Sequence, residues 1–255
     1  METKITDGRI NISGNIVARS KPKFADYMLY LNDGKPIAVV EAKDNNHSVS
    51  HGLQQAMTYA QMMDLPFAYS SNGDAFYEHD FLTGQEQQIA LEEFPTQEML
   101  VARYYAELHS GKGISDMEKK IVSQPYYSSQ STYPPRYYQR NAVNRTVEAI
   151  ARGQQRLLLV MATGTGKTYT AFQIVYRLLR SDLKKRILYL ADRNILVDQS
   201  ILQDFAPLEK TIYKVDFSDK ACLSKIASRE VNFALYHQTV SYTHLRAHET
   251  AANLV

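Results

Sequence analysis

The chain has 255 residues, which is enough for two ordinary domains. Hydrophobic residues make up 44% of it and charged residues 22%, so the composition is that of a globular protein and excludes a disordered chain. The formal net charge of +2 is nearly neutral, so contact with nucleic acid must come from local basic clusters and not from a global field.

Cysteine content and hydropathy exclude further classes of protein. Cys222 is the only cysteine, which excludes an intramolecular disulfide framework and a multi-cysteine zinc site. The amino-terminal residues lack the apolar core of a signal peptide, and the longest apolar run, 157–162, is far shorter than the ~20 residues that cross a bilayer. We therefore predict a cytoplasmic protein that does not span a membrane.

The first part of the chain is predicted to form a hairpin, a helix and two more strands. Strands are expected at 25–31 and 36–43, because an Asp-Gly pair between two apolar runs is a strong hairpin signal. A helix is expected at 48–63, followed by strands at 66–70 and 75–79.

The second part is predicted to alternate strands and helices behind a junction. The stretch 110–135 holds two glycines, a Ser/Tyr-rich run and a Pro-Pro pair, which is typical of a linker. Beyond it we expect helices at 140–152, 167–180 and 194–205, and strands at 156–161, 186–191, 211–215 and 232–236. The pattern predicts an α/β protein, with a mixed sheet and flanking helices followed by a parallel sheet with helices.

Two carboxylates and a lysine are predicted to meet on the hairpin. If Asn32 faces Lys35 across the turn, Asp26 lies opposite Glu41, with Cβ atoms about 5 Å apart, and Lys43 shares the face of Glu41. Opposed like charges on apolar strands are destabilising, and a divalent cation with oxygen ligands compensates them. We therefore expect Asp26 and Glu41 to bind Mg²⁺ for phosphodiester hydrolysis, with Lys43 stabilising the developing negative charge. In isolation, the same pattern more often marks solvated residues of a hairpin.

The sequence around these residues favours a magnesium site over ordinary solvated residues of a hairpin. Residues 24–31 read FADYMLYL, residues 36–43 read PIAVVEAK, and DNNHS and SSNGD follow at 44–48 and 70–74. Together they resemble the nuclease domain of type I restriction enzyme R subunits over most of residues 5–100. The resemblance implies a PD-(D/E)xK cleavage centre formed by the two carboxylates and the lysine.

Gln55 and Tyr59 match the QxxxY motif that accompanies this nuclease in the same family. Their i,i+4 spacing places them on one face of the expected helix. The spacing by itself also fits a plain amphipathic helix, so their catalytic role is implied by the resemblance.

A phosphate-binding loop is predicted after the apolar run at 157–161. The sequence LLLVMATGTGKT gives a strand, a glycine-containing turn and a Lys-Thr pair that opens a helix, which is the context of a P-loop. The glycines let backbone N–H groups close around phosphate oxygens, Lys167 reaches the β- and γ-phosphates, and Thr168 supplies a hydroxyl to Mg²⁺. A turn without a ligand is the alternative. The residues expected to bind ATP are Thr163, Gly164, Thr165, Gly166, Lys167 and Thr168.

Three other segments resemble parts of superfamily 2 helicases. PRYYQ at 135–139 resembles the adenine-reading segment, in which Gln139 hydrogen-bonds the base. Residues 188–199 resemble motif Ia, which contacts the DNA backbone, with Arg193 as the candidate contact; helix capping or a surface ion pair is its alternative role. ALYHQT at 234–239 resembles the segment that follows. No Asp-Glu-x-His box occurs, so we expect ATP binding without turnover.

These features predict a nuclease domain at 1–110, a linker at 111–135 and a truncated first RecA-like helicase domain at 136–240. Residues 241–255 resemble a translated sequencing-adapter peptide, and we expect an artefact there. By resemblance, the full-length protein couples ATP-driven translocation of double-stranded DNA to its cleavage, with methyltransferase (M) and specificity (S) subunits as partners. The alternatives are a freestanding superfamily 2 helicase with a non-catalytic DNA-binding domain, and a non-enzymatic remnant that binds DNA.

Overall fold

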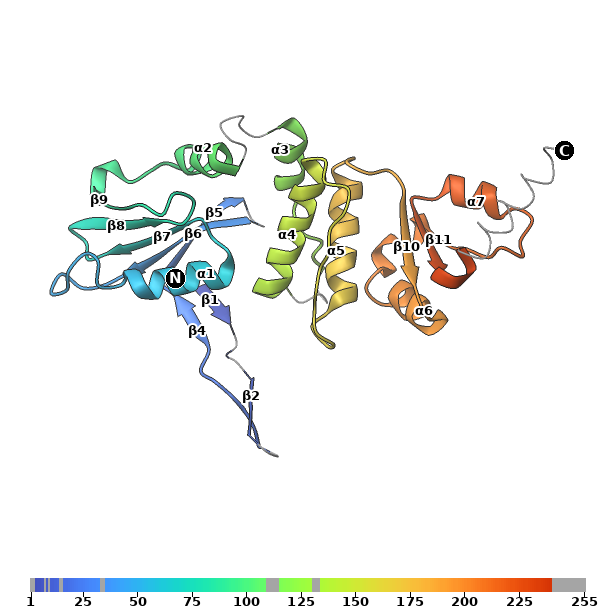
Figure 1. Cartoon of the computed structure of the whole chain (residues 1–255), viewed down its shortest axis with the longest axis horizontal. Coiled ribbons are helices and arrows are strands. Elements are labelled where there is room, and N and C mark those ends of the chain that lie inside the picture. The colour runs from blue at the N-terminus through green and yellow to red at the C-terminus, as the bar shows by residue number, and fades with distance from the viewer. Residues whose placement is uncertain are drawn as a thin grey trace. The chain divides into compact units, whose positions relative to one another are not determined.

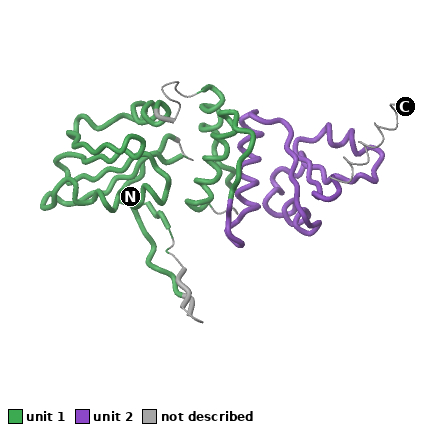
Figure 2. Tube along the Cα trace, in the orientation of Figure 1, with its two compact units in different colours: residues 1–159 green, residues 160–255 purple. Residues whose placement is uncertain are grey.

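The computed structural model describes residues 3–6, 8, 10–13, 16–32, 35–108, 115–129 and 134–239. The chain forms two compact units, residues 1–159 and 160–255 (Figure 2). The units divide downstream of the predicted linker, so helix α4 (Tyr137–Ala151) belongs to unit 1. The separation into a nuclease and a helicase domain stays a prediction, and the predicted artefact at 241–255 lies outside the described residues.

Unit 1 is built on a mixed five-stranded sheet (Figure 1). Its strands, in spatial order, are β5 (Tyr27–Asn32), β6 (Lys35–Ala42), β7 (Phe67–Ser71), β8 (Ala75–Asp80) and β9 (Glu86–Ala90). β6 and β7 pair in parallel, and the other neighbours pair antiparallel. Because parallel neighbours need a crossover, helix α1 (Leu53–Met63) connects them.

Both faces of the sheet are covered, which explains the unbroken apolar run in β6. Val39 faces α1 and packs in one cluster with Ala56 and Met63, whereas Val40 lies on the opposite face in a cluster with Leu100 of helix α2 (Gln97–Leu108). Alternate residues of β6 therefore bury against different helices. The predicted hairpin, helix and two strands of this region are confirmed, although the helix begins five residues later than expected.

Several elements of unit 1 were not predicted. They are the strand pairs β1 (Thr3–Thr6) with β4 (Lys23–Ala25) and β2 (Ile10–Ser13) with β3 (Ile16–Arg19), strand β9, the 3-10 helix η1 (Leu91–Glu93), and helices α2 and α3 (Asp116–Val122). Helix α3 lies inside the predicted linker. Ser115 and Glu118 form a capping box at its start, a sequence signal that the Gly-rich flank obscures.

Unit 2 contains a parallel sheet of three strands in the order β10 (Ile187–Ala191), β12 (Val231–Leu235) and β11 (Ile212–Lys214). Its helices are α5 (Lys167–Arg180), α6 (Asn194–Leu202), the 3-10 helix η2 (Ala206–Thr211) and α7 (Cys222–Ser228). The central strand is buried, with Phe233 stacked on Tyr189 at 4.6 Å between ring centroids. The predicted parallel sheet is confirmed, and α5 has the predicted bounds.

The strand predicted at 156–161 does not form. In the described part of the chain these residues pair with no strand, and Leu158 and Val160 are each 87% exposed. A buried strand needs neighbours that satisfy its backbone N–H and C=O groups. The apolar run indicates a preference for burial, but it does not supply those neighbours, so this prediction is wrong for the structure. Among the described residues, no helix is long and apolar enough to cross a membrane.

Candidate functional site

Asp26 and Glu41 meet where the chain enters β5. The ladder pairs Tyr27 with Val40, which confirms the predicted register at this end of the hairpin; the register shifts only nearer the turn. Asp26 occupies the bend just before β5, and its Oδ2 accepts a hydrogen bond of 2.8 Å from the Ala42 N–H. The carboxylate of Asp26 is therefore held beside the end of β6 that carries Glu41.

The side chain of Glu41 is almost completely buried, at 1% exposure. Its Oε1 accepts no hydrogen bond from the described residues, and its Oε2 lies 3.6 Å from Lys43 Nζ. Burial and the charge of Asp26 raise the pKa of Glu41 to about 7, although the charge of Lys43 acts in the opposite direction. A cation bound at this carboxylate would favour its ionised form.

Lys43, Gln55 and Tyr59 form a chain of contacts that starts at Glu41. Lys43 Nζ donates to Gln55 Oε1 at 3.5 Å, and Gln55 Nε2 donates to the Tyr59 hydroxyl at 3.3 Å. Gln55 and Tyr59 share one face of α1, as their spacing predicted. The five residues proposed from the sequence for the nuclease centre are thus brought together by β5, β6 and α1.

Gly52 adjoins the same centre and was missed by the sequence reasoning. A Cβ atom at this position would lie 2.8 Å from Ser70 Oγ, 3.1 Å from Glu41 Cβ and 3.3 Å from Lys43 Cε. The Gly52 N–H donates to Ser70 Oγ at 3.0 Å, and Ser70 is the ladder partner of Glu41 in β7. The sequence signal is a glycine before a helix, which indicates a cap but not this contact.

The donor set fits a magnesium ion. In the part of the chain that the structure describes, no group of three or more His, Cys, Asp or Glu side chains could hold a metal. The candidate ligands are therefore the carboxylates of Asp26 and Glu41. Mg²⁺ commonly binds proteins through one or two carboxylates and completes its shell with water and substrate phosphates. The buried Glu41 Oε1, which lacks a hydrogen-bond donor among the described residues, is suited to such an ion.

The predicted phosphate loop precedes α5 in unit 2. Gly164 and Gly166 have φ values of 78° and 80°, which residues other than glycine rarely adopt. Gly166 occupies the N-cap position of α5, so the first N–H groups of the helix face the turn. Lys167 Nζ donates to the Ala162 carbonyl at 3.2 Å. The six residues predicted for ATP binding therefore span the turn before α5 and the first two residues of that helix.

Gln139 and Arg193, the other two predicted contacts, have structural partners. Gln139 lies in unit 1, is 8% exposed, and its Oε1 accepts a hydrogen bond of 2.9 Å from the Arg136 N–H at the start of α4. Arg193 precedes α6 at 77% side-chain exposure, with its Nε 3.8 Å from Asp192 Oδ2. Arg193 occupies the N-cap position of α6 without a capping hydrogen bond from its side chain, so of its two alternative roles the surface ion pair is the one observed.

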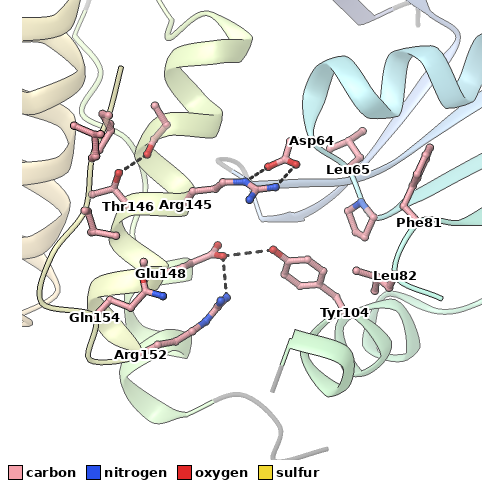
Figure 3. A pocket seen from close by; sticks show the side chains of 16 residues that line it. Asp64, Leu65, Phe81, Leu82, Tyr104, Arg145, Thr146, Glu148, Arg152 and Gln154 are labelled. Carbon is pink, nitrogen blue, oxygen red and sulfur yellow. Dashed lines mark hydrogen bonds and ion pairs between the residues drawn. The ribbon is translucent and has the colours of Figure 1, made fainter. Parts of the chain in front are cut away.

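A cavity of about 560 Å³ lies beside α4 within unit 1 (Figure 3). Figure 3 shows Glu148 directed toward Tyr104 and Arg145 directed toward Asp64. The Tyr104 hydroxyl donates to Glu148 Oε2 at 3.4 Å, and Arg145 forms an ion pair with Asp64. Because Arg145 of α4 pairs with Asp64 beside this cavity, we interpret the cavity as part of the structural contact between α4 and the five-stranded sheet of unit 1.

Two family models match the sequence. Residues 2–95 match "Type I restriction enzyme R protein N terminus", and residues 132–253 match "Type III restriction enzyme, res subunit". The chain is similar to the N-terminal region of type I restriction R subunits, followed by a helicase-like domain. The resemblance found from the sequence is confirmed at this level.

Known type I R subunits extend the same similarity. The endonuclease subunit of the type I restriction enzyme EcoAI from Escherichia coli is 46% identical over 218 residues, which cover 84% of this chain and 26% of that protein. The EcoKI endonuclease subunit from Escherichia coli strain K12 is 31% identical over 226 residues, covering 70% of this chain and 18% of that protein. The chain therefore spans about a quarter or less of these R subunits.

A solved structure gives the same result for the fold. A fragment assigned as an HsdR subunit of a type I restriction enzyme from Vibrio vulnificus YJ016 matches with a TM-score of 0.73 and 38% identity. The match covers 92% of this chain and 42% of that one. The fold of this chain, with its mixed and parallel sheets, is therefore similar to that of the fragment.

Proposed function

We propose that unit 1 contains the PD-(D/E)xK nuclease centre of a type I restriction endonuclease subunit. The observation that carries the proposal is the convergence of two carboxylates and a lysine. Asp26 lies beside the buried Glu41, and Lys43 Nζ is 3.6 Å from Glu41 Oε2. Glu41 is buried with an Oε1 that accepts no hydrogen bond from the described residues, so its charged form is costly without a compensating cation.

In this proposal Asp26 and Glu41 would hold Mg²⁺, and the ion would supply positive charge beside the scissile phosphodiester. Lys43 stabilises the negative charge that develops on the phosphate. Gln55 fixes the position of the Lys43 ammonium group through the hydrogen bond of 3.5 Å, and Tyr59 orients Gln55.

We further propose that unit 2 carries the first ATP-binding part of a RecA-like motor. Its predicted phosphate loop would bind the nucleotide with Mg²⁺ at Thr168, and Arg193 would contact the DNA backbone. Gln139 belongs to unit 1, so its role in reading the adenine stays a prediction from the sequence. In the full-length protein, ATP-driven translocation of double-stranded DNA would be coupled to cleavage, in complex with M and S subunits in the cytoplasm. The similarity to type I restriction endonuclease subunits and the positive φ values of Gly164 and Gly166 support this proposal.

The test is cleavage of supercoiled plasmid by the purified chain in excess Mg²⁺ or Mn²⁺, against Asp26→Asn, Glu41→Gln and Lys43→Ala. We expect relaxation or linearisation that EDTA abolishes and that each variant loses. Asp116→Asn is the matched control, because this carboxylate is exposed on α3. Cleavage that survives in all three variants, or no cleavage by the unmodified chain, would overturn the assignment and favour a non-catalytic DNA-binding domain.

A further inference from the structure

A basic segment leads along the chain into the proposed nuclease centre. Residues 8–25 contain four cationic side chains, Arg9, Arg19, Lys21 and Lys23, and no Asp or Glu. The whole chain has a net charge of only +2, so this is a marked local excess. Arg19, Lys21 and Lys23 are exposed and recur at every second position just before Asp26.

Lys23 is placed against neutral side chains. Its Nζ lies 5.7 Å from the centroid of the Tyr59 ring and 3.8 Å from Met62 Sδ, both on α1. Within the described residues, neither Lys21 nor Lys23 forms an ion pair with a carboxylate. Because an aromatic ring carries no net charge, a cation held over it can still bind an anion such as a phosphate.

Lys23 is connected to the centre through Tyr59. The Tyr59 hydroxyl accepts from Gln55, whose Oε1 accepts from Lys43, and Lys43 lies 3.6 Å from Glu41. One continuous series of contacts therefore runs from the basic segment to the buried carboxylate.

Exposed aromatic rings accompany the cations on the same stretch of chain. Phe24, which follows Lys23, is 40% exposed, and Tyr27, which follows Asp26, is 53% exposed. Basic side chains interleaved with aromatic rings suit a nucleic acid, because the cations bind phosphates and the rings pack against sugars or bases.

We propose that Arg19, Lys21 and Lys23 form a phosphate-contacting track that holds duplex DNA at the entrance of the Asp26–Glu41 centre, with Lys23 innermost. The inference rests on the proposed nuclease function. DNA is favoured over an acidic protein segment because the track leads to groups suited to phosphodiester chemistry. Lys23 is a substrate-positioning residue and not a catalytic one, because it is connected to the reacting groups through Tyr59.

The test is equilibrium binding of fluorescent duplex DNA in EDTA over a series of salt concentrations, so that no cleavage occurs. Lys21→Gln/Lys23→Gln should bind more weakly and lower the slope of log K against log salt by about 2, since each phosphate contact contributes about 0.9. The loss should be the same for duplexes of unrelated sequence. Lys119→Gln/Lys120→Gln on α3 removes two exposed lysines from the same unit and should leave the slope unchanged.

Each other outcome contradicts the track. An unchanged slope in Lys21→Gln/Lys23→Gln, an equal loss in the control pair, or no duplex binding by the unmodified chain overturns it; binding of an acidic peptide in place of DNA does the same. Cleavage is scored separately with Mg²⁺. If the salt slope of Lys21→Gln/Lys23→Gln changes but the unmodified chain does not cleave DNA, the phosphate-contacting track is supported and the nuclease proposal is wrong. If the chain cleaves DNA but the slope is unchanged, only the track is wrong.

Discussion

Lys35 and Glu148 form a buried ion pair that joins the start of β6 to helix α4. Their side chains are only 8% and 6% exposed. Lys35 Nζ also lies 4.4 Å from the centroid of the Tyr104 ring. Figure 3 shows the neighbouring ion pair, in which Arg152 Nη2 is 3.5 Å from Glu148 Oε2. Because Glu41 lies near the other end of β6, the pair anchors α4 to the strand that carries the proposed nuclease centre.

Glu148→Gln should destabilise unit 1 by about 3 kcal/mol, because it removes the carboxylate that pairs with the buried Lys35 charge. The double variant Lys35→Met/Glu148→Leu should lose less stability than Glu148→Gln, because it buries neither charge. Lys119→Ala breaks the exposed pair with Asp116 and should cost less than about 1 kcal/mol. Differential scanning calorimetry measures the three effects, and equal shifts for Glu148→Gln and Lys119→Ala would contradict a buried pair.

Glu41→Gln should change how stability depends on pH. The folded-state pKa of Glu41 is about 7, above its ordinary value of 4.5, so between these values the folded protein keeps a proton that the unfolded chain releases. Stability of the unmodified chain therefore falls as pH rises from about 4.5 to 7, whereas the neutral glutamine adds no such dependence. In EDTA and above pH 7, the thermal midpoint of the variant should exceed that of the unmodified chain. The difference between the two midpoints should shrink as the pH falls toward 5. A difference that does not vary with pH would show that Glu41 titrates normally.

Gly52→Ala should impair cleavage without weakening DNA binding. The backbone of Gly52, at φ −84°, accepts alanine, but the new Cβ would press on Ser70 Oγ and Glu41 Cβ. A displaced carboxylate should reduce the cleavage rate about 10- to 100-fold and raise the Mg²⁺ concentration for half-maximal rate, while duplex affinity in EDTA stays the same. Gly52→Ala/Ser70→Ala removes the closest contact and should recover part of the rate. If it recovers none, the effect is not steric.

Lys167→Ala should weaken nucleotide binding by unit 2. The ammonium group follows Gly166 at the helix N-terminus, where it would meet the β- and γ-phosphates. Titration with a fluorescent ATP analogue should show saturable binding that weakens at least about tenfold in the variant, because a charge-assisted contact to phosphate is lost. Lys184→Ala, an exposed lysine after α5, should bind like the unmodified chain. We expect no steady ATP turnover by either protein, and turnover lost in Lys167→Ala would contradict this.

Local sequence patterns determined much of the fold. Apolar periodicity placed α5 at its observed bounds and β10 and β12 within one residue of theirs. The hairpin register predicted from the sequence is observed at the end where Asp26 lies beside Glu41, and an i,i+4 spacing put Gln55 and Tyr59 on one face. These features depend on residues close together in the chain, so the sequence alone could predict them.

Tertiary structure decided the features that join distant segments. The Lys35–Glu148 pair spans 113 residues, the Gly52 contact with Glu41 depends on how α1 seats against β6 and β7, and the burial of Glu41 depends on the same packing. The apolar run at 156–161 carries every local mark of a strand and still pairs with none in the described structure. Strand pairing, burial and ion pairing are properties of neighbours in space, and the local pattern of a segment does not contain its neighbours.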